Sequence, residues 1–419
     1  MYSVKAMGFI DPMALLHVKP QDARKSDKPM QEVAPKHGLG SAWVAGFLAV
    51  LISYAGPLVI FIQAAQAGNM SSDALTSWIW AISIGAGVSG LLLSWCLKLP
   101  IITAWSAPGT ALLLSLLPDI SMPEVVGAYV TSAVIVMVIG FSGAFEKVVK
   151  HIPSGIAAGM MAGILFQFGL QAFHASMDMP AVVFSMLLAY MLGKRWWPRY
   201  TVVLVAITGF CVALGMGQTN LHALSLELAR PVFVAPVFNF GVFLSFTLPL
   251  VVVSLTGQYL PGMAVLQLAG YRVPSRAVVG GTSLASLGIA CFGGITIVLA
   301  AITAALCTGK DAHPNPQKRY VAGIANGCFY LIGGSFAGTI VQIFSAFPAA
   351  LIAALAGLAL MGAIAANLRI IVGEPSYMEP SVIAFLATAS GMTIFGLGAA
   401  FWGVVLGMLA YWLRRKEPA

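Results

Sequence analysis

The sequence contains 419 residues, of which 59% are hydrophobic and 9% are charged. Its formal net charge of +8 reflects 22 Lys and Arg residues against 14 Asp and Glu residues, but the basic residues form short, separated clusters beside apolar stretches. This pattern is typical of the loops of a membrane protein and argues against a nucleic-acid-binding surface. Because charges are costly at the centre of a bilayer and backbone polar groups must be satisfied within the chain, we predict an all-α, multi-pass membrane protein.

Residues 1–38 differ from the rest of the chain, since charged residues and several prolines alternate there without a long apolar run. A secretory signal peptide needs an uninterrupted apolar core followed by a small-residue cleavage site, and this stretch has no such pattern. We therefore predict a cytoplasmic tail that is mostly disordered.

From residue 41 onward, apolar windows of the length that crosses a bilayer as a helix, about 20 residues, predict about fourteen spans. They lie near 41–67, 74–97, 101–117, 124–145, 154–173, 179–193 and 200–216, and near 240–268, 275–292, 295–308, 320–343, 348–368, 381–396 and 399–413. With both termini in the cytoplasm, every Lys and Arg except Arg230 falls on the cytoplasmic side. Because Lys and Arg concentrate in cytoplasmic loops, this asymmetry supports both the number of spans and their orientation.

The third and tenth spans are poor helices. Residues 99–109 begin with β-branched residues and then carry the Pro108-Gly109 pair, and residues 293–303 begin with two glycines and are also β-branched. Each sequence predicts an extended half followed by a half-helix. Both are the third member of a seven-span half, and interrupted segments at corresponding positions of two halves indicate the binding site of a transporter.

Other correspondences between the two halves favour an inverted seven-plus-seven repeat. Residues 153–163 resemble residues 348–357, and the first and eighth spans both carry Tyr, Pro and Gln in that order. The matching residues are Tyr54, Pro57 and Gln63 in the first span, and Tyr259, Pro261 and Gln267 in the eighth.

Several stretches resemble the benzoate:proton symporter (BenE-type) family. They are residues 103–111, 261–266, 300–305 and 389–393, together with the His313-Pro314 loop. The resemblance extends in order from Trp43 to Trp412. It implies a secondary active transporter of the bacterial inner membrane that imports benzoate by proton symport, with the fold of nucleobase and sulfate permeases.

In that fold, spans 1–4 and 8–11 form a core domain and spans 5–7 and 12–14 form a gate domain. The resemblance implies alternating access, with substrate bound between spans 3 and 10, and it is compatible with a homodimer. The expected partners are benzoate or a similar small aromatic anion, a proton and the lipid bilayer, without nucleic acid. The corresponding division of the chain is a tail over 1–38, core over 39–149, gate over 150–217, a periplasmic loop with core over 218–346, and gate with a short cytoplasmic tail over 347–419.

The sequence departs from the nucleobase carriers at two positions that matter for the substrate. Those carriers place glutamates in spans 8 and 10, whereas residues 254–259 and 299–303 contain none here. A nucleobase needs polar partners for its hydrogen-bonding edge, while a nearby carboxylate would repel an anion. The absence of both acids favours an anionic aromatic substrate.

The candidate substrate-binding residues surround the starts of the two half-helices, because helix N-termini bind anions through free N–H groups and the positive end of the dipole. We expect the two N-termini to face one another across the middle of the membrane. The candidates there are Trp105, Ser106, Ala107, Pro108, Gly109, Ala301 and Thr303. Gln258 could donate to a carboxylate or form an interhelical hydrogen bond, and Tyr54 and Tyr259 are either pocket walls or core aromatics.

Proton coupling usually needs an acid or a histidine within the membrane. All six histidines lie in the tail or loops, and the nearest acids, Glu124 and Glu146, lie at the two ends of the fourth span. We therefore favour a proton that travels on the substrate carboxyl group, with Glu146 as the alternative side-chain carrier.

Other functional classes find little support in the sequence. The five cysteines form no Cys/His cluster with metal-binding spacing, so we expect neither a metal nor a cofactor. Residues 85–90 match a dinucleotide-binding pattern, but they lie within an apolar span and indicate helix packing. No paired intramembrane carboxylates support an enzyme. The alternatives that remain are a carrier for another small organic anion or a nucleobase and, with less support, a passive anion channel.

Overall fold

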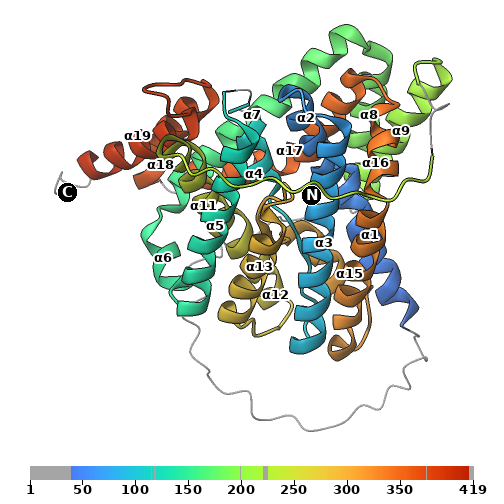
Figure 1. Ribbon diagram of the computed structural model, residues 1–419, viewed down its shortest axis with the longest axis horizontal. Coiled ribbons are helices and arrows are strands. Elements are labelled where there is room, and N and C mark those ends of the chain that lie inside the picture. Colours follow the sequence, from blue (N-terminus) through green and yellow to red (C-terminus); the bar gives the residue numbers. More distant parts are fainter. Residues whose placement is uncertain are drawn as a thin grey trace, which may run out of the picture. The chain divides into compact units, whose positions relative to one another are not determined.

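The described part of the chain is built almost entirely from helices (Figure 1). The computed structural model describes residues 39–414 apart from 115, 118, 199, 220–224 and 374, so the predicted N-terminal tail and residues 415–419 lie outside the described residues. The first half contains α1 (Gly40–Ala55), α2 (Pro57–Ala67), α3 (Ser72–Leu97), β1 (Thr103–Trp105), α4 (Ala107–Leu114), α5 (Met122–Ser142), α6 (Phe145–His151), α7 (Ser154–Asp178), α8 (Pro180–Trp196) and α9 (Thr201–Gly215).

The second half begins with a helix that is interrupted by two π-helical turns, and it ends with three longer helices. Its elements are α10 (Phe240–Val242), η3 (Phe243–Thr247), α11 (Leu248–Ser254), η4 (Leu255–Tyr259), α12 (Leu260–Leu268), α13 (Ser275–Ala290), β2 (Ile297–Leu299), α14 (Ala301–Thr308), η5 (Pro316–Lys318), α15 (Tyr320–Ser335), α16 (Ala337–Ser345), α17 (Ala349–Gly373), α18 (Pro375–Ala389) and α19 (Ala399–Arg414).

Six helical stretches among the described residues are long and apolar enough to cross a membrane. They are Gly40–Ala67, Ser72–Leu97, Met122–Ser142, Ser154–Asp178, Phe240–Leu268 and Ala349–Gly373. The pair Pro316–Ser335 and Ala337–Ser345, which is bent by 71°, makes a seventh if the two helices form one span. The chain is therefore a multi-pass, mostly helical membrane protein. The prediction of about fourteen spans also includes shorter helices and the two strand–helix segments. None of these is a single helix long enough to cross a membrane.

Prolines account for the two π-helical turns in the helix from α10 to α12. A proline within a helix lacks an N–H group and its ring clashes with the carbonyl four residues earlier. Pro249 and Pro261 each follow a π-helical turn, η3 or η4, and the carbonyl four residues earlier lies inside that turn. The wider turn relieves the clash while the helix continues, and turns of this kind are frequent at functional sites.

Two short strands form an antiparallel ribbon in the interior of the protein. Thr103 of β1 pairs with Leu299 of β2, and Trp105 pairs with Ile297. The pairing continues at both ends, because Ser106 donates its N–H to the carbonyl of Thr296 (3.0 Å) and Ala300 donates to that of Ile102 (2.9 Å). The β-branched residues of both segments favour this extended conformation. Each strand leads directly into a short helix, α4 or α14.

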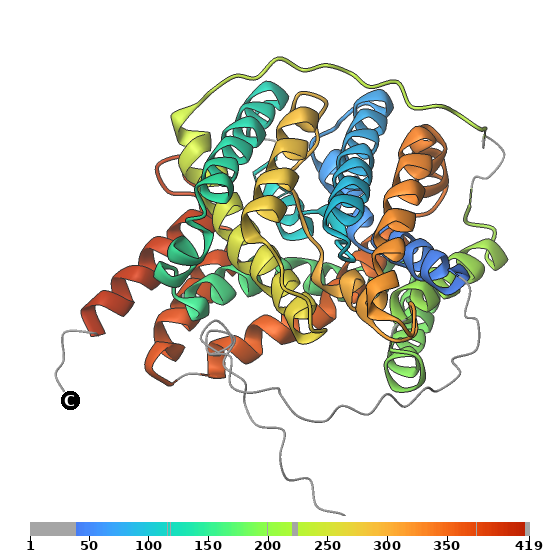
Figure 2. The same cartoon turned by 90° about the horizontal axis from the view of Figure 1, so that it is seen from below.

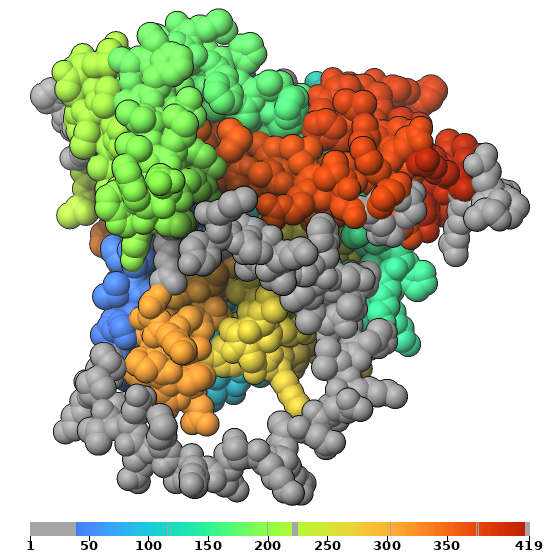
Figure 3. Space-filling view, turned by 180° about the vertical axis from the view of Figure 1, so that it is seen from behind, coloured from blue at the N-terminus to red at the C-terminus, as the bar shows by residue number. Residues whose placement is uncertain are grey.

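The longer helices pack in two groups. In the first group α3 packs against α15 and α13, α5 against α13, and α1 against α15. In the second group α7 packs against α17 and α18, α18 against α19, and α8 against α9. Figure 3 shows the second group, in green and red-orange, gathered on one side of the molecule. Small residues permit the close packing: a Cβ added at Gly140 of α5 would lie 2.6 Å from the nitrogen of Gly280 on α13.

Residues 225–239 run in extended conformation past the ends of the helices of the first group, which Figure 2 shows in yellow-green. Backbone hydrogen bonds fix this segment, since Ala229, Val234 and Val237 donate to carbonyl groups at the ends of α15, α13 and α5. Gly127 of α5 permits the approach, because a Cβ there would lie 2.1 Å from the carbonyl oxygen of Val237.

Candidate functional site

The N-terminus of α4 is closed by its own residues. Ser106 Oγ accepts a hydrogen bond from the backbone N–H of Gly109 (3.1 Å), and the Ser106 carbonyl accepts from the backbone N–H of Thr110 (2.9 Å). Pro108 contributes no N–H group. The donors that a helix N-terminus normally presents to an anion are therefore largely used within α4 itself.

The N-terminus of α14, in contrast, has no side-chain cap. Thr303 lies in its first turn, is only 5% exposed, and has a hydroxyl group without a hydrogen-bond partner among the described residues. A buried hydroxyl group without a partner costs about 1–3 kcal/mol. An anion at this terminus would satisfy the Thr303 hydroxyl and the free backbone N–H groups at once.

The two helix N-termini lie at opposite ends of the β1–β2 ribbon. Ser106, just before α4, is opposite Thr296, whereas Ala300, just before α14, is opposite Ile102. Four residues of extended chain separate these positions, which corresponds to roughly 13 Å. A single carboxylate group therefore cannot contact both N-termini, and the free donors favour α14.

Three aromatic side chains meet beside the ribbon. The rings of Tyr54 and Trp105 are stacked at 6.0 Å, and Tyr330 contacts both of them edge-on, at 5.8 and 5.9 Å. The Tyr54 hydroxyl lies 2.8 Å from Ser83 Oγ. Trp105 is 2% exposed, and its indole nitrogen has no partner among the described residues. Sequence reasoning missed Tyr330, since a single aromatic within an apolar span carries no local signal.

The direction of α1 places this aromatic cluster towards the N-terminal end of α14. At the start of α1, Ser41 Oγ donates to the carbonyl of Ala312, which lies beyond the C-terminus of α14 (2.8 Å). Further along α1, Ala49 belongs to the same buried cluster as Ala300 and Ala304. The two helices are therefore antiparallel, and Tyr54, near the end of α1, lies towards the start of α14.

Gln258 and Tyr259 are neighbours in the chain but have different surroundings. Gln258 is half-buried within η4, and its amide has no hydrogen-bond partner among the described residues. The following helix, α12, packs against α14. Tyr259 is fully buried, and its hydroxyl lies 2.6 Å from Thr282 Oγ1 and donates to the carbonyl of Ile297 (3.0 Å). Gln258 is thus available to a ligand, whereas the Tyr259 hydroxyl is engaged in holding β2 to its neighbours.

The other predicted site residues differ in how accessible they are. Gly109 is enclosed, because a Cβ added there would lie 2.4 Å from Leu250 Cδ1. Its lack of a side chain thus permits close packing against α11. Ala107 and Ala301 are half-buried, at the first position of each half-helix. Among these positions, Ala301 combines accessibility with an uncapped helix terminus.

The two candidate carboxylates lie away from this cluster. Glu124 accepts hydrogen bonds from Ser121 at the start of α5, and Glu146 lies on α6, where Ser275 Oγ donates to it (3.2 Å). Glu124 thus lies at the start of α5 and Glu146 at the start of α6, at the two ends of the predicted fourth span. The residues assembled around the ribbon, Tyr54, Trp105, Gln258, Thr303 and Tyr330, are polar or aromatic and uncharged.

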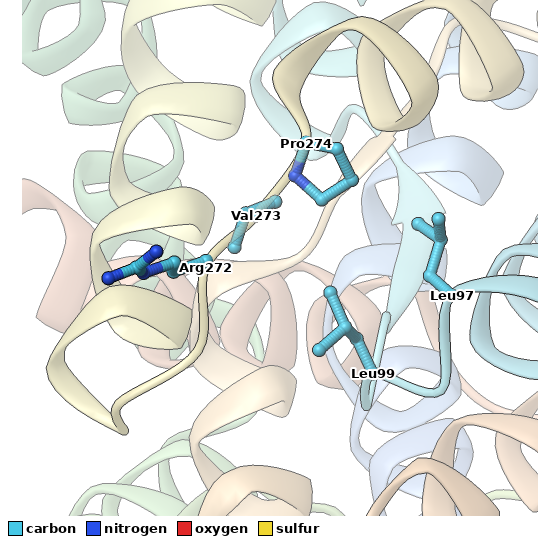
Figure 4. Close-up of a pocket in the computed structure, with 5 residues that line it drawn as sticks. All are labelled: Leu97, Leu99, Arg272, Val273 and Pro274. Atoms are coloured by element: carbon cyan, nitrogen blue, oxygen red, sulfur yellow. The ribbon is translucent and has the colours of Figure 1, made fainter.

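An open cavity of about 350 Å³ lies at the loops that precede β1 and α13. Figure 4 shows Leu97 and Leu99 on one side of it and Val273 and Pro274 on the other, with the Arg272 side chain directed away from the two leucines. Its walls are apolar and its one basic group does not point between them. This cavity therefore lacks the features of an anion site.

Two solved structures share the fold of this protein. The transmembrane domain of the cyanobacterium bicarbonate transporter BicA matches with a TM-score of 0.57 and 14% identity, over 91% of this chain and 98% of that chain. The overall structure of SLC26A9 matches with a TM-score of 0.62 and 13% identity, over 92% of this chain and 67% of that one. Together with its apolar helices, this similarity makes the protein a multi-pass membrane protein with the fold of these two structures.

Residues 39–413 match the family described as benzoate membrane transport protein, and the chain belongs to that family. The benzoate membrane transport protein of Acinetobacter baylyi is 55% identical over 90% of this chain and 96% of its own length. The inner membrane protein YdcO of Escherichia coli is 36% identical over 88% of this chain and 94% of its own. The family resemblance found in the sequence is thus confirmed, and the family is one of transport proteins rather than enzymes.

Proposed function

We propose that this protein imports benzoate, or a closely similar aromatic carboxylate, across the bacterial inner membrane by proton symport. The observation that carries the proposal is that an uncapped helix N-terminus lies towards an aromatic cluster. The described residues assembled there include no charged side chain. In this arrangement the carboxylate lies at the start of α14, where it accepts from the Thr303 hydroxyl and from backbone N–H groups. The ring lies towards Tyr54 and Trp105.

Transport by this site requires that it open to each side in turn. We propose fourteen spans in an inverted seven-plus-seven repeat, with both termini in the cytoplasm. The helices α1 to α5 and α10 to α16 form a core domain that holds the ribbon, and α7 to α9 with α17 to α19 form a gate domain. The separate packing of these two groups supports a relative movement between them.

A liposome assay with labelled benzoate tests the proposal directly. We expect uptake against a concentration gradient when the exterior is acidic, and only equilibration when the pH gradient is collapsed by a protonophore. Excess unlabelled benzoate should compete, whereas uracil and acetate should not. Competition by either compound would instead favour a nucleobase carrier or a carrier of small organic anions, and uptake that never exceeds equilibration would favour a passive channel.

Replacing Gln258 by leucine is expected to weaken benzoate binding by about 1–2 kcal/mol, the scale of a hydrogen bond to a charged group. The side chain is half-buried and its amide has no partner among the described residues, so the change should leave the fold intact. Equilibrium binding of labelled benzoate to the purified protein measures the effect. Gln267→Leu, on α12 of the same helical stretch, is the matched control. Unchanged affinity in the folded Gln258→Leu variant would exclude this role.

Neutralising Glu146 is expected to leave proton-driven accumulation intact, because we propose that the proton travels on the substrate. The pKa of the substrate carboxyl group resembles that of Glu, about 4.3, and burial of the substrate among apolar groups raises this pKa. Accumulation of benzoate under a pH gradient should therefore be near normal in Glu146→Gln and in Glu124→Gln. Retained benzoate exchange with loss of pH-driven accumulation in Glu146→Gln would show that this side chain carries the proton.

A further inference from the structure

A second cavity, of about 340 Å³, lies between α5 and the chain that enters the helix from α10 to α12. On α5 its walls come from one helix face, with residues spaced by three or four positions. Among the described residues, the lining consists of Glu124, Gly127, Ala128 and Thr131 of α5, with Phe238, Asn239, Phe240, Val242, Phe243 and Thr247 opposite. None of these residues belongs to the ribbon site or to the aromatic cluster beside it.

The position of this cavity along the helices corresponds to a membrane surface. Both helical stretches that border it, Met122–Ser142 and Phe240–Leu268, are long and apolar enough to cross a membrane, and both begin at the cavity. The first turns of a membrane-spanning helix lie at the depth of the lipid headgroups. A ligand of this cavity is therefore exposed to lipid at the level where headgroups and ester groups are found.

Glu124 is the one charged residue among the described residues of the lining, and its carboxylate is held in place. Oε2 accepts from the backbone N–H and the hydroxyl of Ser121 (2.9 and 2.7 Å), and Oε1 accepts from Asn239 Nδ2 (2.7 Å). Beside it, Phe238 and Phe240 expose 68% and 75% of their surface. A fixed carboxylate next to exposed aromatic rings is a combination that binds organic ammonium groups.

The interior of the cavity offers a further polar group. Thr247 lines the cavity but is only 1% exposed, and its hydroxyl has no hydrogen-bond partner among the described residues. It lies at the end of the wide turn η3, with Val242 and Phe243 forming apolar wall around it. A hydroxyl group in this setting is suited to donate to an ester carbonyl.

We propose that this cavity binds an aminophospholipid, with its primary ammonium at Glu124, an ester carbonyl at Thr247 and an acyl chain along the apolar wall. The carboxylate disfavours lipids with an anionic headgroup. A choline headgroup retains the attraction to the rings but cannot donate a hydrogen bond to the carboxylate. The preferred lipid is therefore one with an ethanolamine headgroup. This site is independent of the transported substrate.

The test uses the full-length protein, delipidated in detergent, and phosphatidylethanolamine, phosphatidylcholine and phosphatidylglycerol with identical acyl chains. Native mass spectrometry then measures the bound fraction of each lipid. We expect about fivefold tighter binding of phosphatidylethanolamine than of phosphatidylglycerol, from one exposed ion pair and a cation–π contact. Glu124→Gln should abolish this preference, and Thr247→Val should reduce phosphatidylethanolamine binding.

The Glu124→Gln variant isolates the charge, because glutamine accepts the same hydrogen bond in the capping arrangement at the start of α5. Ser121→Ala is the matched control, since it removes a capping hydroxyl and leaves the charge, and it should keep the lipid preference. Equal binding of the three lipids by the natural protein, or an unchanged preference in Glu124→Gln, would overturn the proposal. Displacement of the lipid by soluble phosphoethanolamine at equal concentration would also overturn it, in favour of a site for a soluble amine.

Discussion

Replacing Thr303 by valine is expected to weaken benzoate binding about ten- to hundredfold. The change removes one hydrogen bond to a carboxylate, which contributes about 1.5–3 kcal/mol, and it keeps the volume of the side chain. In the protein without substrate, the same substitution is expected to stabilise the fold. The Thr303 hydroxyl is buried without a partner, so the free energy of unfolding should rise by about 1 kcal/mol when a methyl group replaces it.

Two measurements on the purified protein check this prediction, namely equilibrium binding of labelled benzoate and thermal unfolding without benzoate. Thr303→Ser keeps the hydroxyl and is expected to retain affinity within a few-fold. Ser106→Ala, at the equivalent end of α4, should disturb the α4 cap without a comparable loss of affinity, because Ser106 Oγ already accepts from Gly109. Equal losses in Thr303→Val and Ser106→Ala would show that the carboxylate does not distinguish the two helices.

Replacing Ala301 by phenylalanine is expected to abolish uptake while the protein remains folded in the membrane. Ala301 is half-buried at the first position of α14, so an aromatic ring there would occupy the space that a carboxylate needs to approach the backbone. The loss of uptake should be larger than for removal of any single side chain at this site, because the ring blocks all of the backbone N–H donors together.

Ala305→Phe is the matched control for this variant. It makes the same substitution on the same helix, one turn further on, at a position where the side chain is exposed. We expect near-normal uptake by Ala305→Phe, measured in liposomes with the amount of reconstituted protein determined for each variant. Near-normal uptake by Ala301→Phe as well would move the substrate site away from the start of α14.

The sequence alone determined the class of the protein, its family and the position of the two interrupted segments. The family follows from the resemblance of several stretches, whereas the class and the two segments follow from local properties. A bilayer excludes charges, so apolar windows and basic loops mark the membrane segments. Glycine, proline and β-branched residues determine local backbone conformation, so residues 99–109 and 293–303 could be recognised as unlike their neighbours. The structure has a strand and a helix in the corresponding regions, β1 with α4 and β2 with α14.

The tertiary structure alone decided which of these two segments has free donors and which side chains surround them. Ser106 closes the start of α4, while Thr303 at the start of α14 has no partner among the described residues, although both are small hydroxyl residues at similar positions in the sequence. Tyr54 and Tyr330 are distant in the chain but meet at 5.8 Å, and the Tyr259 hydroxyl is engaged by Thr282 and Ile297. Such partners are set by the packing of helices that are remote in sequence, and the local pattern around a residue does not record which atoms will fill the space beside it.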